Sequence, residues 1–131
     1  MKNKFLTIVA ASAIILIGGL AIVLNTLPLK LEKDKISSIV IRNGTTGEGI
    51  TLETEKDITA LVAQFNDLRL VRSKKLEPSG GYTVSLTVYH KRDARKFDQY
   101  SVNSAGINYQ DYLYSNGGEI DFHEKLLGMI D

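Results

Sequence analysis

A long uncharged segment near the N-terminus constrains this chain more than any other feature. Residues 5–24 (FLTIVAASAIILIGGLAIVL) hold no charged side chain, and the next charge after Lys4 is Lys30. An α-helix rises about 1.5 Å per residue, so a segment of this length spans about 30 Å, the thickness of the hydrocarbon core of a bilayer. The segment therefore predicts a transmembrane helix over residues 5–27.

Two fates of this helix stay open. A signal-anchor would remain in the membrane, whereas a secretory signal peptide would be cleaved after small residues, for which Gly19-Leu20-Ala21 is a candidate site. Apolar residues 22–24 continue beyond that site, which favours the signal-anchor. The positive-inside rule nearly balances between the two flanks, but a short basic N-terminus such as residues 1–4 usually stays in the cytoplasm. We therefore expect a single-pass protein of the cell membrane whose C-terminal domain is extracytoplasmic, with secretion after cleavage as the alternative.

The remainder of the chain predicts one small domain behind a short linker. Residues 28–34 contain Pro28 and closely spaced charges, which indicates a tether, and residues 35–131 are numerous enough to bury a core of their own. The chain has no cysteine, which excludes a disulfide framework and thiol chemistry. Acidic and basic residues nearly balance beyond residue 29, so no nucleic acid is expected as a partner.

Local patterns predict the elements of this domain. Alternating and β-branched segments predict strands over residues 36–42, 49–53, 69–75, 83–90, 96–103 and 106–110, with 111–115 as a further short strand. Apolar residues at helical spacing predict a helix that follows Thr54 and reaches residue 68, and a second helix near the C-terminus, over 122–130. Two pairs are expected to cap these helices: Thr54 with Asp57, and Asp121 with Glu124.

The order β-β-α-β-β-β-β-α predicts an α+β fold. Strands joined by short turns pair antiparallel, so we expect a two-layer domain with an antiparallel sheet and the helices on one face. The many basic side chains in residues 69–75 are typical of an edge strand. The strict alternation of TVSLTVYH, residues 83–90, is typical of a half-buried strand inside the sheet.

Basic residues in two segments form the candidate binding surface. If strand 69–75 and turn 91–96 lie side by side, they would create one basic margin for an anionic lipid, an envelope polymer or an acidic protein. The simpler interpretation is a solvated strand edge and a turn. The tyrosines at 100, 109, 112 and 114 are a second candidate recognition group. The basic candidates are Arg69, Arg72, Lys74, Lys75, Lys91, Arg92, Arg95 and Lys96.

No sequence motif indicates catalysis, a metal or a cofactor. The glycine-rich residues 43–49 lead into a strand and lack the lysine of a phosphate-binding loop, so they predict a hairpin loop. His90 and His123 are the only histidines, whereas metal sites usually need three or four ligands and a catalytic histidine needs a partner. We therefore predict no catalytic, metal-binding or cofactor-binding residue, and we favour a binding protein over an enzyme.

The order of these features is similar to that of a known class of proteins. The segments IVIRNGTTGEGITLETEKDITALVAQFNDLRL, SGGYTVSLTVYHK and INYQDYLYS, with a short closing helix, resemble small membrane-anchored extracytoplasmic domains of unknown function from low-GC Gram-positive bacteria. They are also similar to sensor-like segments outside some membrane metallopeptidases of the antibiotic-sensing type. The resemblance covers residues 35–130 and carries over no functional residue. The zinc motif of those peptidases is absent from this sequence, so their activity is not implied.

Three functions follow as hypotheses. The leading hypothesis is a membrane-anchored domain that binds or senses a ligand without catalysis. The first alternative is a small cell-envelope hydrolase, which a buried acid or histidine with a shifted pKa in a cleft would favour. The second is a structural or accessory subunit of a membrane complex, in which Thr7, Ala11 and Gly18 could line a seam between transmembrane helices.

Overall fold

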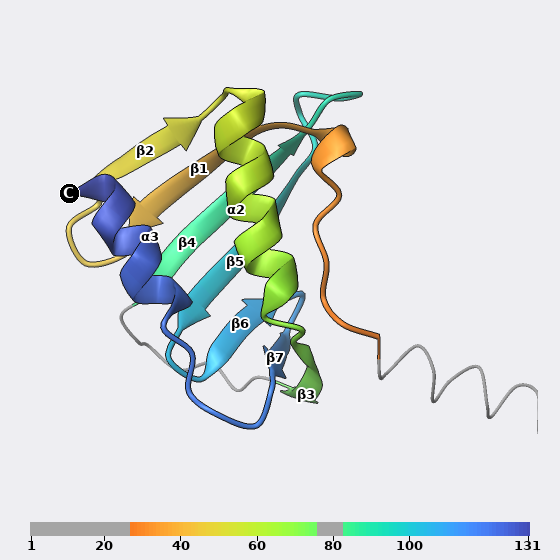
Figure 1. The fold of residues 1–131 in the computed structure, drawn as a ribbon, viewed down its shortest axis with the longest axis vertical. Helices are drawn as coiled ribbons and strands as arrows, with labels where there is room; N and C mark the ends of the chain where they lie inside the picture. Colours follow the sequence, from red (N-terminus) through yellow and green to blue (C-terminus); the bar gives the residue numbers. More distant parts are fainter. Residues whose placement is uncertain (1–26, 76–82) are drawn as a thin grey trace, which may run out of the picture.

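The strands of the domain form one antiparallel sheet beneath two helices. The computed structural model describes residues 27–75 and 83–131, and within these residues seven strands pair in the order β2-β1-β4-β5-β6-β7-β3 (Figure 1). The elements are η1 (Lys33–Lys35), β1 (Ile36–Asn43), β2 (Gly49–Leu52), α2 (Glu55–Asp67), β3 (Val71–Lys75), β4 (Val84–His90), β5 (Phe97–Asn103), β6 (Gly106–Tyr109), β7 (Tyr112–Ser115) and α3 (Phe122–Ile130).

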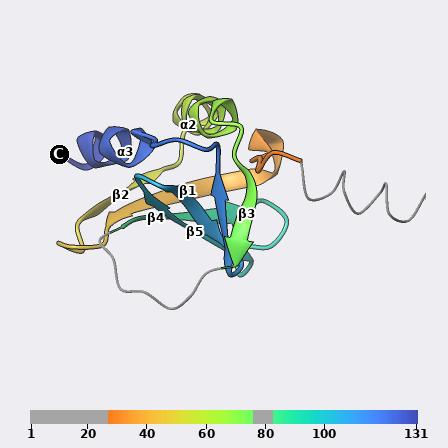
Figure 2. The ribbon, with the colours of Figure 1, turned by 90° about the horizontal axis from the view of Figure 1, so that it is seen from below.

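The predicted α+β class and antiparallel sheet are confirmed, with one strand more than the predicted order. The additional strand is β7, at the place of the further short strand suggested for residues 111–115. Both helices lie on the same side of the sheet, as expected (Figure 2). The apolar residues 5–24, the candidate cleavage site and the candidate helix seam all lie outside the described residues. Among residues 27–75 and 83–131, no helix combines the length and the apolar character that crossing a bilayer requires.

Helix α2 begins and packs as its sequence predicts. The Thr54 hydroxyl accepts a hydrogen bond from the backbone N–H of Asp57 at 3.2 Å, which satisfies one of the free amides of the first turn. Its apolar face is buried, and Phe65 makes edge-to-face contacts with the rings of Tyr100 and Phe122 at centroid distances of 5.4 and 6.1 Å. Phe65 therefore joins the two helices to the sheet.

The predicted cap of helix α3 is wrong. Asp121 stands at the N-cap position, but its side chain accepts no capping hydrogen bond. Its backbone, at φ −108° and ψ 8°, is not in the extended conformation that aims a capping side chain at the first amides. The carboxylate instead lies 3.7 Å from Lys125, one helical turn along.

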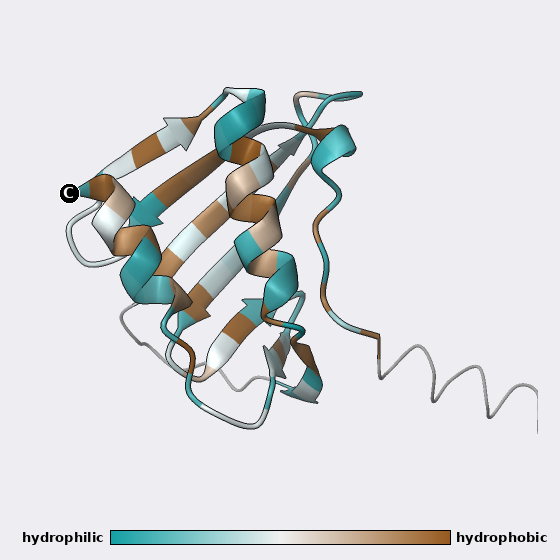
Figure 3. Cartoon of the chain, in the orientation of Figure 1, coloured by the Kyte–Doolittle hydropathy of each residue, from teal (hydrophilic) through white to brown (hydrophobic). Residues whose placement is uncertain are grey.

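The strand register places apolar side chains on the face beneath the helices. Ile41 is opposite Leu86, and Leu86 is opposite Tyr100, so alternate residues of β1, β4 and β5 share that face. Hydrophobic bands accordingly recur along β1 and β4 in Figure 3. Strand β4 (Val84–His90) is an interior strand and β3 (Val71–Lys75) is an edge strand, which confirms both predicted positions in the sheet.

The segment predicted as a tether, residues 28–34, packs against the domain. The Leu31 N–H donates to Asn66 Oδ1 at 2.8 Å, and Asn66 Nδ2 donates to the Leu31 carbonyl at 3.0 Å. The Leu29 N–H donates to the Leu70 carbonyl at 2.6 Å, and the Leu31 side chain is only 6% exposed. The folded unit therefore includes residues N-terminal to the predicted boundary at residue 35, because apolar side chains in the linker have a place in the core.

Candidate functional site

A cleft lies between this docked N-terminal segment and the middle of the sheet. Its volume is about 260 Å³. One wall consists of residues 29–32 with Lys35 and Ile36, and the other is formed by side chains from β4, β5 and β6. Figure 1 shows the segment passing beside α2, and Figure 2 shows it on the side of the sheet that both helices cover. The cleft is therefore a gap in the helical layer that the N-terminal segment only partly fills.

A hydrogen-bonded network forms the sheet wall of the cleft. The Asp98 carboxylate lies 2.9 Å from His90 Nε2 through Oδ2, and its Oδ1 accepts from the Tyr109 hydroxyl at 3.0 Å. Gln110 Nε2 donates to the Tyr109 hydroxyl at 3.0 Å. The Asp98 and His90 side chains are 31% and 34% exposed, so both remain accessible from the cleft. We name these three residues, His90, Asp98 and Tyr109, the network.

The antiparallel register explains why the network forms. Asp98 is opposite Val88, which faces the helices, so its carboxylate lies on the covered face; His90, two residues after Val88, lies on the same face. Tyr109 lies beside Tyr100 of the adjacent strand. Their rings stack at a centroid distance of 4.4 Å and an angle of 15°. Polar groups from three strands thereby meet at one end of the covered face.

Both stacked tyrosines are held in the neutral form. Burial raises the pKa of Tyr100, whose side chain is almost inaccessible, and the charge of Asp98 adds to this effect. Burial also raises the pKa of Tyr109, and its hydrogen bond to the Asp98 carboxylate adds to the shift. A protonated Tyr109 hydroxyl is the donor that Asp98 needs, so the Tyr109–Asp98 hydrogen bond persists across the neutral pH range.

The chemistry of the cleft suits recognition of a small polar molecule. The network offers a carboxylate, an imidazole and a phenol, while Leu29, Leu31 and the tyrosine rings offer apolar surface. The described residues that line the cleft include no serine, threonine or cysteine that could act as a nucleophile. Across residues 27–75 and 83–131, no group of three or more histidine, cysteine, aspartate or glutamate side chains is placed to hold a metal ion.

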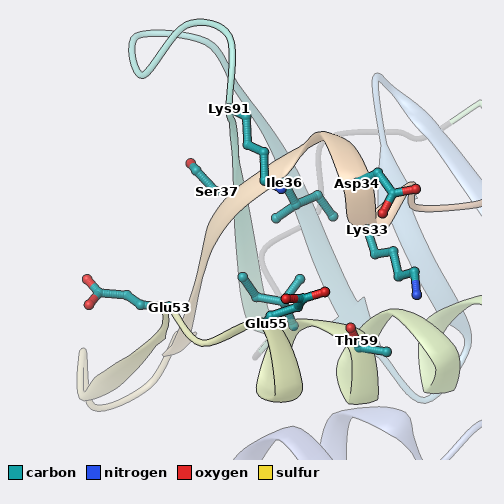
Figure 4. Close-up of a pocket in the computed structure, with 9 residues that line it drawn as sticks. Lys33, Asp34, Ile36, Ser37, Glu53, Glu55, Thr59 and Lys91 are labelled. Atoms are coloured by element: carbon teal, nitrogen blue, oxygen red, sulfur yellow. The ribbon is translucent and has the colours of Figure 1, made fainter.

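A second hollow lies between η1, β1 and the start of α2, but its charged groups do not converge. Its volume is about 220 Å³. Figure 4 shows the side chains that line it. Glu53 points away from Asp34 and Lys33, and Lys91 extends toward Ile36 from the turn after β4. Glu53 therefore does not act together with Asp34 and Lys33 on one ligand.

A third hollow lies beside the start of α3. It has a volume of about 580 Å³ and is lined by Asp121, His123 and Glu124 among others. Within the described part of the chain, His123 Nδ1 is shielded from solvent and has no hydrogen-bond partner. The acids around it are exposed and belong to the helix terminus, so they form no defined site with this histidine.

The eight basic candidates fall into two separate groups. Strand β3 and turn 91–96 are not neighbours, because β7, β6 and β5 lie between β3 and β4. Arg72 is engaged within the domain: its guanidinium lies 4.0 Å from the centroid of the Tyr112 ring, and Nη2 donates to the Tyr114 hydroxyl at 3.4 Å. Arg69, Lys74 and Lys75 lie exposed along or just before β3. The single basic margin is therefore not formed, and partner binding by these residues stays a prediction.

Sequence reasoning missed the network itself. The pattern predicts His90 only as a strand-end histidine, and it gives Asp98 and Tyr109 no role beyond their strands. The one local signal is the position of Asp98 in the alternation of β5. Asp98 lies on the same face of the strand as Tyr100 and Val102, so a charged residue occupies a covered position. Comparison of the chain with protein-family models, with curated proteins and with solved structures gave no match.

Proposed function

We propose that this chain is a membrane-anchored, extracytoplasmic domain that binds or senses a small polar ligand in the cleft beside residues 29–36. One observation carries the proposal. The segment that connects the apolar residues 5–24 to the domain forms one wall of the cleft, and the network forms the other. A ligand in the cleft would touch both the folded domain and the connection to the predicted membrane helix.

The direction of the pKa shifts in the cleft favours binding over catalysis. General acids and bases are usually tuned toward the pH at which they work. Here the resolved shifts in the cleft raise the pKa of Tyr100 and Tyr109, which moves these groups further from neutrality. Tyrosines held neutral are poor proton acceptors, and Tyr109 already donates its hydroxyl proton to Asp98.

The docked segment gives a route from binding to the membrane. Two hydrogen bonds to Asn66 and the burial of the Leu31 side chain hold the segment in place, and a ligand that also contacts the segment would favour this docked form. A ligand that contacts Lys30 or Glu32 together with the network would favour the docked form. A sensor needs this kind of differential contact between two states of one segment.

The test is a ligand screen with the full chain in detergent micelles. We would use a panel of monosaccharides, amino acids and short peptides as probes and measure the thermal midpoint of unfolding. A probe that binds in the cleft should raise the midpoint of the parent chain but not of the Asp98→Asn or Tyr109→Phe variants. Asp121→Asn is the matched control, because its carboxylate is exposed and remote from the cleft. If every stabilising probe acts equally on all four proteins, the cleft is not the binding site.

Anchoring is tested separately. A retained transmembrane helix should keep the chain in the membrane fraction after an alkaline carbonate wash, with the domain open to added protease on the extracytoplasmic side. Release into the wash, or a chain shortened after Ala21, would instead indicate secretion after cleavage.

A small cell-envelope hydrolase is the second candidate, and the His90–Asp98 pair favours it. A carboxylate that orients a histidine is a common arrangement for a general base, here acting on water because the described lining offers no nucleophile. Turnover of ester, glycoside or peptide substrates that His90→Gln abolishes would replace the binding proposal. The third candidate, an accessory subunit, would be recognised by a partner that co-purifies in detergent only when residues 5–27 are present.

A further inference from the structure

We propose that the turn at residues 91–96, with the exposed ring of Phe97, docks on the anionic lipid surface of the membrane. The inference rests on the proposed membrane anchoring, and it adds a second contact between the domain and the bilayer. We name residues 91–97 together with Tyr89 the docking turn. Residues 91–96 connect β4 to β5.

The docking turn presents a concentrated positive charge. Lys91, Arg92, Arg95 and Lys96 are all exposed, and among the described residues none of them forms an ion pair. The single acid, Asp93, serves the turn itself: its Oδ1 accepts from the Arg95 N–H at 3.0 Å, and its carbonyl accepts from the Lys96 N–H at 3.0 Å. These hydrogen bonds fix the backbone of the turn, while Arg92, Arg95 and Lys96 are exposed and the Lys91 side chain extends toward Ile36.

An exposed aromatic pair lies beside this charge. Phe97 is 54% exposed, and its ring lies 5.8 Å from the ring of Tyr89. Both rings are on the open face of the sheet, because their neighbours Val88 and Asp98 face the helices. Aromatic rings next to lysine and arginine are typical of surfaces that meet the interfacial region of a bilayer.

The fold places the docking turn near the connection to the predicted anchor. The Lys91 N–H donates to the Lys35 carbonyl at 2.9 Å, which ties the turn to the N-terminal segment. Residues 27–35 and the loop between β4 and β5 lie on the same side of the domain in Figure 1. Lys30 and Lys33 are also exposed along this side. A bilayer entered by the chain before residue 27 can therefore meet the turn as well, and this favours lipid over a soluble polyanion.

Tryptophan fluorescence tests this contact directly. The chain contains no tryptophan, so Phe97→Trp in the full chain gives a single reporter. We would reconstitute it into vesicles of phosphatidylglycerol with brominated acyl chains, and into matched phosphatidylcholine vesicles. We expect at least twofold quenching in the anionic vesicles, and a loss of most of it at high salt, where surface charges are screened. The combined changes Lys91→Gln, Arg92→Gln, Arg95→Gln and Lys96→Gln should have the same effect as salt.

The matched control is Thr45→Trp. Thr45 is exposed in the loop between β1 and β2, at the end of the sheet opposite the docking turn, because Asn43 pairs with Val84 and Ile36 pairs with His90. Its tryptophan should show little quenching in either lipid. Equal quenching at the two positions, or quenching at position 97 that ignores lipid charge, would overturn the inference.

Two further measurements separate lipid docking by the turn from membrane anchoring and from general binding of polyanions. Retention after an alkaline wash reports anchoring alone, so quenching at position 97 of a chain that washes off supports the turn and contradicts the anchor. Soluble polyphosphate reports a general preference for polyanions. If polyphosphate changes the emission of the Phe97→Trp reporter as strongly as the anionic vesicles do, the turn binds anionic polymers and the assignment to lipid is wrong.

Discussion

The two halves of the covered face of the sheet carry different kinds of side chain. Toward β1 and β4, aliphatic side chains such as Ile39, Ile41 and Leu86 meet the helices and are fully buried. Around the paired strands β5 and β6 near Asp98, the same face carries Tyr100, Tyr109 and the Asp98 carboxylate, and residues 29–32, which have no regular structure, cover it together with Phe65 of α2. We call these the apolar half and the polar half.

The difference shows where this fold can accommodate a ligand. Burial of aliphatic groups is non-directional and leaves no group for a ligand to replace, so the apolar half serves stability. Hydrogen bonds such as those of Asp98 and Asn66 are directional, and competing donors or acceptors can exchange with them. The cleft lies in the polar half, where directional hydrogen bonds to Asn66 and Leu70 hold the cover beside the buried Leu31 side chain.

The largest expected effect is in the apolar half. Leu86→Ala removes a fully buried side chain at the centre of the sheet, and we expect it to lower the free energy of unfolding by about 2–5 kcal/mol. Thr87→Ala, one residue away on the open face, should cost less than about 1 kcal/mol. Chemical denaturation of the detergent-solubilised chain measures both. Equal costs for the two variants would mean that the covered face is not the core.

The next effect is in the polar half, at the docked segment. Asn66→Ala leaves the N–H and the carbonyl of Leu31 without their partner, so we expect a loss of about 1–3 kcal/mol in unfolding free energy. Hydrogen exchange should also show that the Leu31 amide loses its protection. Asp67→Ala, an exposed neighbour on α2, is the control and should leave that amide protected. If the Leu31 amide exchanges equally slowly in both variants, residues 29–31 are held by their apolar side chains alone.

The features of the apolar half can be predicted from the sequence better than those of the polar half. The strand at 84–90 and the helix after Thr54 follow from period and capping, because these signals are local. The edge position of β3 follows from its charge. These features build the apolar half and the frame of the sheet.

The polar half depends on long-range contacts that local patterns do not contain. Asp98, His90 and Tyr109 meet only through the register of three strands, and residue 31 meets Asn66 across 35 positions of the chain. The separation of β3 from the turn after β4 likewise depends on the order of strands in the sheet, because three strands lie between β3 and β4. The failed cap at Asp121 depends on backbone angles that the capping pattern does not specify.

Alkaline pH should reduce the stability that comes from the polar half, because the stacked tyrosines lie only in that half. The folded state raises the pKa of Tyr100 above its ordinary value of 10.0, so the unfolded chain loses this proton first as pH rises. Stability from Tyr100 is therefore present below about pH 10 and declines above it, by about 1 kcal/mol between pH 10 and pH 11. Denaturation curves at both pH values should show a smaller decline for Tyr100→Phe than for the parent, whereas Thr87→Ala should decline like the parent. A parent that is equally stable at both pH values would contradict the burial of this hydroxyl.

The smallest effect concerns the turn that positions Tyr109. Gln110 and Asp111, between β6 and β7, have φ values of 47° and 68°, the left-handed region in which a hairpin turn of two residues favours glycine. Asp111→Gly removes the steric cost of the side chain and adds backbone entropy to the unfolded chain, so we expect a net gain of about 0.5 kcal/mol. Asp111→Ala keeps the strained backbone and should give no gain. Hydrogen exchange should place the added protection in β6 and β7 and leave the β1 and β4 amides unchanged, because the turn belongs to the polar half alone. If glycine and alanine act alike, the left-handed backbone at position 111 carries no steric cost and the turn is not strained.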